Sequence, residues 1–110
     1  MEEEWQRKLE EEKLERKLSV IRDAIQSQRA FRDAQIELRK GMTFYKFWID
    51  PEERHPCLIV FTRECLLNQN EDKIIGALER EVFGNMSNAS EPMEFFITES
   101  REGICVRRQS

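Results

Sequence analysis

The chain lacks the features that mark membrane, secreted and disulfide-stabilised proteins. No apolar run approaches the ~18–20 residues that a helix needs to span a bilayer, so we expect no membrane span. The sequence begins Met-Glu-Glu-Glu, whereas a secretory signal begins with basic residues. The cysteines are odd in number and show no C-x-x-C spacing. We therefore expect free thiols and a reducing compartment, cytoplasmic or nuclear, for Cys57, Cys65 and Cys105.

Motifs of catalysis and of cofactor binding are also missing. The four glycines stand singly, so no glycine-rich loop is present to hold a phosphate group. G-x-S-x-G, H-E-x-x-H and Walker-type patterns do not occur. We therefore predict that the protein is not an enzyme, with no catalytic residue, no cofactor, no metal and no small-molecule substrate.

One short segment does collect residue types that bind metals or act as nucleophile and base. All its members lie within one expected hairpin connection, and the chain has only one histidine. We interpret the segment as structural, and a metal site or thiol chemistry remains as an alternative. Its residues are Asp50, Glu52, Glu53, His55 and Cys57.

Composition divides the 110 residues into two parts. Residues 1–40 hold equal numbers of basic and acidic residues and no glycine, proline or cysteine. Residues 41–110 hold every glycine, proline and cysteine and the whole net charge of −4. We predict a long helix over 1–40, which serves as a dimerisation or partner helix, and a small α+β head over 41–110. The acidic charge of the head argues against a sequence-independent grip on nucleic-acid phosphate backbones.

The expected helix carries a short apolar seam. Leu14, Leu18, Ile21 and Ile25 follow one another at steps of 4, 3 and 4, which is the spacing of a coiled coil. A second apolar side of the helix is expected to pack on the head. The alternative is a single charged helix that packs only on its own head and is frayed before residue 14. The predicted partner interface comprises Leu14, Leu18, Ile21, Ile25, Phe31 and Leu38.

Beyond Gly41 the apolar pattern changes to the period of two that is typical of strands. Asn70 followed by two acidic residues indicates the start of a helix. The fold class we predict is α+β, with the long helix followed by a ββαββ head and an antiparallel four-stranded sheet. The expected strands cover 43–49, 57–61, 93–98 and 104–107, and the expected short helix covers 71–83.

Both faces of this sheet are expected to be apolar, because Tyr45 and Phe47 alternate with Phe44 and Trp48. One face requires the helix over 71–83. The other requires the end of the long helix, a second chain or a ligand. The last strand is a further candidate, because an open edge there accepts an added strand unless its arginines guard it. The candidate binding surface comprises Phe44, Trp48, Phe96, Ile104 and Val106.

These patterns predict a non-enzymatic protein–protein interaction module, an adaptor or assembly subunit that forms a homodimer or pairs with a heteromeric coiled-coil partner. The alternative is a small nucleic-acid-binding or regulatory domain. In that case bases stack on the aromatic side chains and Lys46, Arg101, Arg107 and Arg108 hold the phosphates.

Overall fold

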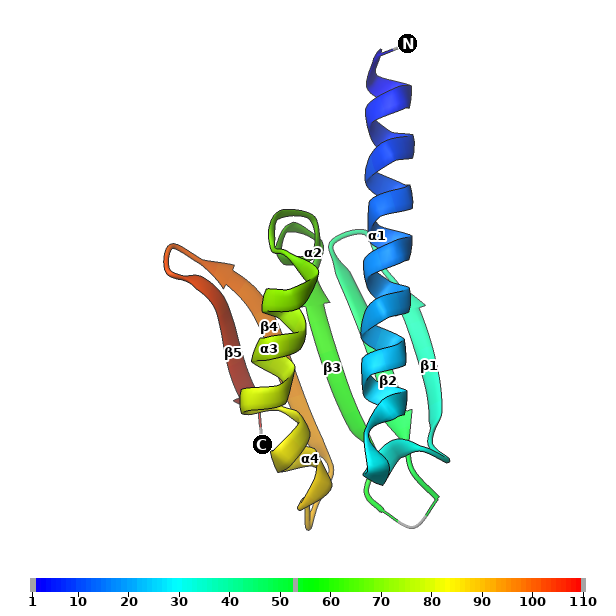
Figure 1. Cartoon of the computed structure of the whole chain (residues 1–110), viewed down its shortest axis with the longest axis vertical. Helices are drawn as coiled ribbons and strands as arrows, with labels where there is room; N and C mark the ends of the chain where they lie inside the picture. The colour runs from blue at the N-terminus through cyan, green and yellow to red at the C-terminus, as the bar shows by residue number, and fades with distance from the viewer. Residues whose placement is uncertain (1, 53, 110) are drawn as a thin grey trace.

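The computed structural model describes residues 2–52 and 54–109. It confirms an α+β chain that begins with a long helix (Figure 1). The helices are α1 (Glu2–Ser27), α2 (Arg63–Asn68), α3 (Glu71–Glu81) and α4 (Phe83–Ser87), with a 3-10 turn at Arg29–Phe31. The strands are β1 (Gln35–Lys40), β2 (Phe44–Asp50), β3 (Cys57–Thr62), β4 (Met93–Ser100) and β5 (Gly103–Gln109).

The sheet has five strands in the order β1-β2-β3-β4-β5. Consecutive hairpins pair β1 with β2, β2 with β3 and β4 with β5 in antiparallel fashion, whereas β3 and β4 are parallel. The parallel pair arises because α2, α3 and α4 return the chain to the end of the sheet where β3 began. The prediction of four antiparallel strands in a ββαββ order was therefore wrong in strand number and in one pairing.

The extra strand comes from the segment that was predicted to end the long helix. The helix stops at Ser27, and Gln28 adopts extended backbone angles of φ −67° and ψ 133°. The amide of Gln26 donates to the carbonyl oxygens of Phe31 and Arg32 at 2.7 and 2.8 Å, which holds the reversed chain against the helix end. Residues 35–40 then pair with β2 over their whole length. The predicted helix over 1–40 is thus a helix, a turn and a strand.

All helices lie on one face of the sheet. In Figure 1, α1 runs over the side of β1 and β2, and α3 with α4 runs over the other side. The core forms between this helical layer and the sheet, and Phe47 and Phe61 meet there edge to face at 5.9 Å. The end of the long helix was one of three expected covers for the face opposite the short helix, but α1 covers the same face as α3, so no described element covers the other face.

The residues of the predicted coiled-coil seam belong to this core. Leu14, Leu18, Ile21 and Ile25 are at most 3 % exposed, and Phe31 is fully buried beside them. Leu38 is partly buried against the same cluster. A four-residue stripe with steps of 4, 3 and 4 fits a sheet as well as a partner helix, because both require one apolar helix face. An interface built on these side chains would require α1 to leave the sheet.

Local signals elsewhere agree with the structure. The side chain of Asn70 accepts a hydrogen bond from the backbone N–H of Asp72 at 2.8 Å, which confirms the predicted start of α3. Gly103 has a φ of 122°, a conformation that favours glycine, where the tight turn after β4 enters β5. None of the helices in the described ranges is long and apolar enough to cross a lipid bilayer.

The outer edge of β1 is partly closed by α1. The N–H of Gly41 donates to the carbonyl of Phe44 at 2.8 Å, so the backbone groups of Ile36 point outward by the alternation of an antiparallel pair. The guanidinium of Arg22 donates to the carbonyl oxygen of Ile36 at 3.0 Å. A strand that approached this edge would meet an acceptor that is already occupied.

Candidate functional site

The uncovered side of the sheet is the main candidate for function, and we call it the open face. Burial alternates along β2, so Tyr45, Phe47 and Ile49 are buried while their neighbours point to the open face. The strand register then places further side chains on it. Its apolar members are Phe44, Trp48, Leu58, Val60 and Phe96, and its charged members are Glu37, Arg39, Lys46, Asp50, Glu94 and Arg107.

The apolar members form a strip across the middle of the sheet. Trp48 lies opposite Leu58, and Val60 lies between Lys46 and Phe96 in the register, where it is only 2 % exposed. Phe44 and Trp48 remain 43 % and 39 % exposed, although both are large aromatic side chains. An apolar strip of this kind, rimmed by charge, is typical of a surface that binds a partner.

The charged members give the open face a different electrostatic character from that of the chain. Arg39, Lys46 and Arg107 contribute three positive charges, and Glu37, Asp50 and Glu94 contribute three negative ones, so the open face has no net charge. The whole chain carries −4. Glu37 and Arg39 form an exposed ion pair at 3.2 Å, which contributes little to stability. These side chains are therefore available to a partner.

The structure separates the predicted binding surface into two groups. Phe44, Trp48 and Phe96 share the open face. Ile104 and Val106 lie opposite Glu99 and Ile97 in the register, on the helical side, and are partly buried against the core. Sequence reasoning did not include Leu58 and Val60. The unbroken apolar run of β3 indicated these two residues, because a strand that is apolar at every position places apolar side chains on both faces of the sheet.

Comparisons of the chain with family models, with curated proteins and with solved structures found no match. Function is therefore inferred from the residues themselves.

The segment with metal-ligand residue types does not form a reactive pair. The thiol of Cys57 donates weakly to the backbone carbonyl of His55 at 3.7 Å, and burial raises the pKa of this thiol. Glu53 lies outside the described residues. Within residues 2–52 and 54–109 no group of three histidine, cysteine, aspartate or glutamate side chains is placed to hold a metal ion.

The remaining buried thiol is also unsuited to nucleophilic chemistry. Cys65 is fully buried, and burial together with the charge of Glu99 raises its pKa to about 11. The thiolate is the reactive form of cysteine. Both Cys57 and Cys65 are therefore poor nucleophiles at neutral pH.

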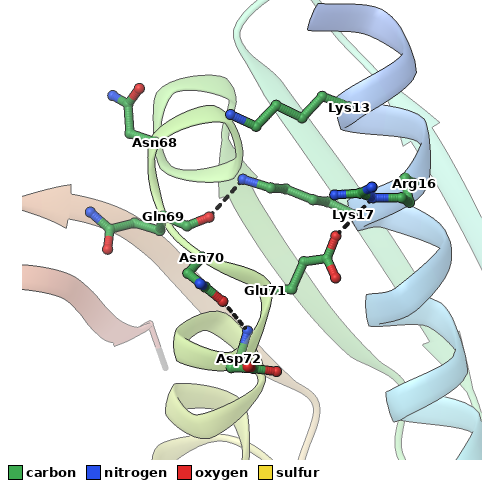
Figure 2. A pocket seen from close by; sticks show the side chains of 8 residues that line it. All are labelled: Lys13, Arg16, Lys17, Asn68, Gln69, Asn70, Glu71 and Asp72. Atoms are coloured by element: carbon green, nitrogen blue, oxygen red, sulfur yellow. Dashed lines mark hydrogen bonds and ion pairs between the residues drawn. The ribbon is translucent and has the colours of Figure 1, made fainter.

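A second candidate is a polar pocket of about 350 Å³ between α1 and the start of α3. Figure 2 shows Lys13, Arg16 and Lys17 reaching into it from α1. Arg16 is paired with Glu71 at 3.1 Å, and the acidic Asp72 also lines the pocket. Because acidic side chains already occupy the positive end of α3, the pocket does not favour an anion.

Lys17 has a structural role in this pocket. Its buried ammonium donates to the backbone carbonyl oxygen of Leu66, and to those of Leu67 and Gln69 at 3.3 and 2.6 Å. These carbonyls belong to the carboxyl end of α2, where a positive charge is favourable. Burial of the ammonium and, secondarily, the nearby charge of Lys13 lower the pKa of Lys17 from its ordinary value of 10.5.

We expect Lys17→Met to lower the free energy of unfolding by about 1–3 kcal/mol at neutral pH, because buried carbonyls lose their donor. Between the lowered pKa and 10.5 the unfolded chain binds more protons than the folded one. The contribution of Lys17 to stability therefore rises with pH in that window. Urea denaturation should show the gap between wild type and Lys17→Met widening in the alkaline range and levelling off above 10.5.

The matched control is Lys13→Met, since Lys13 lines the same pocket from an exposed position. It should change stability by no more than about 0.5 kcal/mol. Equal stability of Lys17→Met and wild type at every pH would show that the three hydrogen bonds have no net effect.

The first turns of α1 are a third candidate. They project past the end of the sheet in Figure 1, and residues 3–13 are all exposed. Trp5 and Leu9 lie one turn apart there, at 69 % and 56 % exposure. Two apolar side chains among charged ones form a weaker surface than the open face.

Proposed function

We propose that the chain is a non-enzymatic protein–protein interaction module, an adaptor or assembly subunit that binds its partner through the open face. The single observation that carries this proposal is the uncovered apolar strip. A five-stranded sheet with helices on one side leaves Phe44 and Trp48 in water, and burying apolar surface of this kind is favourable by about 25 cal/mol per Å².

The electrostatics of the open face favour a partner with both apolar and charged groups. Lys46 and Arg107 flank Val60 and Phe96 in one row of the register, so a positive charge lies on either side of the apolar centre. Charges around an apolar centre steer a partner and fix its register. The interaction surface thus differs from the helix seam that the sequence predicted.

The projecting turns of α1 are the remaining place for a partner helix. Trp5 and Leu9 face outward at the i,i+4 spacing of a helical contact. A coiled-coil contact of the kind predicted from the sequence would use these residues, because Ile21 and Ile25 are in the core.

A second candidate function is binding of single-stranded nucleic acid on the same face. Phe44, Trp48 and Phe96 offer flat rings, and Lys46 and Arg107 lie beside them. Such rings stack on bases in proteins that bind single strands. The acidic Glu37 and Glu94 on the same face repel phosphates and make this the weaker candidate.

A photo-crosslinking amino acid placed at Phe44 tests the protein-interaction proposal. Benzoyl-phenylalanine there should give crosslinks to protein in the cells that make the chain, and Trp48→Ala in the same chain should reduce their yield. The matched control position is Glu79, which is exposed on α3. Equal yields at the two positions would contradict the proposal.

Fluorescence anisotropy separates the two candidate functions. We expect labelled single-stranded RNA and DNA of mixed sequence to show no salt-dependent binding. The reason is that acidic side chains lie among the basic ones on the open face and repel phosphates. Binding that weakens strongly between low and physiological salt would support the nucleic-acid function instead.

A reducing compartment, cytoplasmic or nuclear, is part of the same proposal. Cys57 and Cys65 are buried as free thiols, and Cys105 is partly exposed without a disulfide partner. Unpaired cysteines of this kind are typical of proteins in a reducing environment.

A further inference from the structure

We propose that the partner seated on the open face is a second copy of this chain, packed sheet against sheet. This inference rests on the proposed function, because it names the occupant of the same surface. It follows from the order in which charged and apolar side chains cross the sheet, and from the size of the face.

Two adjacent rows of side chains cross the open face. The first row runs Glu37, Trp48, Leu58 and Glu94 from β1 to β4. The second row runs Arg39, Lys46, Val60, Phe96 and Arg107 from β1 to β5. The first row is acidic at Glu37 and Glu94, the second is basic at Arg39, Lys46 and Arg107, and Asp50 lies next to the first row on β2.

In the proposed dimer the open faces of two copies are in contact. The two-fold axis lies between the faces, perpendicular to the strands and midway between the two rows. This axis places the first row of each copy opposite the second row of the other. Glu37 then meets Arg39 of the second copy, Trp48 meets Lys46, and Leu58 meets Val60. At the ends of the face, Glu94 meets Phe96 and Asp50 meets Phe44. Each of these contacts occurs twice, because a two-fold interface is self-complementary. The Trp48 ring beneath an ammonium group is a favourable cation–π arrangement.

Other two-fold arrangements bring like charges together. An axis through the second row would place Lys46 on Lys46 and Arg39 on Arg39. An axis parallel to the strands through β3 would place Arg39 on Arg107. Like charges across an interface are costly when water is excluded. Of the three axes compared, the one midway between the rows is the only one that joins Glu37 to Arg39 of the second copy.

The size of the face is close to the lower end of the range for stable interfaces. Strands of six to eight residues that rise about 3.3 Å per residue, with five strands about 4.8 Å apart, outline roughly 500 Å² before side-chain relief is added. Stable interfaces bury about 600 Å² per partner at the small end of their range. Aligned sheets pack about 10 Å apart at a modest angle, and long side chains such as Lys46 and Arg39 span that offset.

Sedimentation equilibrium tests the inference on the whole chain. The wild type should form a dimer with a dissociation constant in the micromolar range, and Trp48→Ala should weaken it by roughly tenfold or more. The matched control is Trp5→Ala, which changes the chain's other exposed tryptophan and should leave the dimer unchanged. Circular dichroism verifies that both variants are folded.

Charge reversal tests the register itself. Glu37→Arg alone places like charges against Arg39 of the second copy, and Arg39→Glu alone does the same with acidic groups, so each variant should dissociate. A mixture of the two variants should form the dimer again, since every contact in the mixed pair joins opposite charges. A merely structural effect of either substitution would not be repaired by mixing.

The results separate this inference from the function on which it rests. A wild type that stays monomeric up to roughly 100 µM, or a dimer that ignores both Trp48→Ala and the charge reversals, overturns the second-copy proposal. Crosslinks from Phe44 to a different protein would then still support the interaction module. Salt-sensitive binding of RNA or DNA by the monomer would overturn both.

Discussion

Replacing Ile21 and Ile25 together with aspartate should unfold the entire chain. Both side chains are at most 1 % exposed and face the sheet. Each loses about 2–5 kcal/mol of packing when truncated, and a buried carboxylate without a partner adds a further penalty. The total is about 5 kcal/mol or more, which is comparable to the whole stability of a small domain.

Far-ultraviolet circular dichroism and urea denaturation measure this effect. The matched control is Trp5→Asp with Leu9→Asp, which makes the same pair of changes at the same spacing on the exposed part of α1. That control should retain the fold. If the Ile21→Asp/Ile25→Asp variant stayed folded and lost only self-association, the result would support the coiled-coil seam expected from the sequence.

Phe47→Ala and Trp48→Ala should differ strongly although the two residues are neighbours on β2. Phe47 is fully buried and meets Phe61 edge to face, so we expect a loss of about 3–5 kcal/mol in the free energy of unfolding. Trp48 is 39 % exposed on the open face, so its loss should be about 1 kcal/mol or less.

Urea denaturation of the two variants side by side gives both values, since each lacks one aromatic ring of the same strand. Similar losses would mean that the open face is covered within the folded monomer. That result would remove the basis for an interaction surface at Trp48.

Much of the sheet was readable from the sequence because strands alternate. The pattern of Tyr45 and Phe47 against Phe44 and Trp48 predicted correctly which side chains share a face. The helix start at Asn70 was equally readable, since a side-chain cap is a local feature. Both features depend on residues that are close together in the sequence, and tertiary packing agrees with these local preferences.

The segment after Ser27 was not readable for the opposite reason. Its glutamate, arginine and lysine residues favour helices, and only Ile36 and Leu38 show the alternation of a strand. Strand β1 exists because β2 offers it a pairing edge along its whole length. The same limit applied to the seam, because periodicity shows that a helix face is apolar but not which surface it meets.

The contact between Arg22 and the Ile36 carbonyl affects whether a further strand can add to this edge of the sheet. A sheet that could accept new strands on both flanks would have no natural stopping point and would grow into fibres. Here the outer edge of β1 is partly closed by Arg22 from the neighbouring helix α1. One of the outward-facing acceptors of β1 is thereby occupied, which hinders the addition of a further strand along that flank.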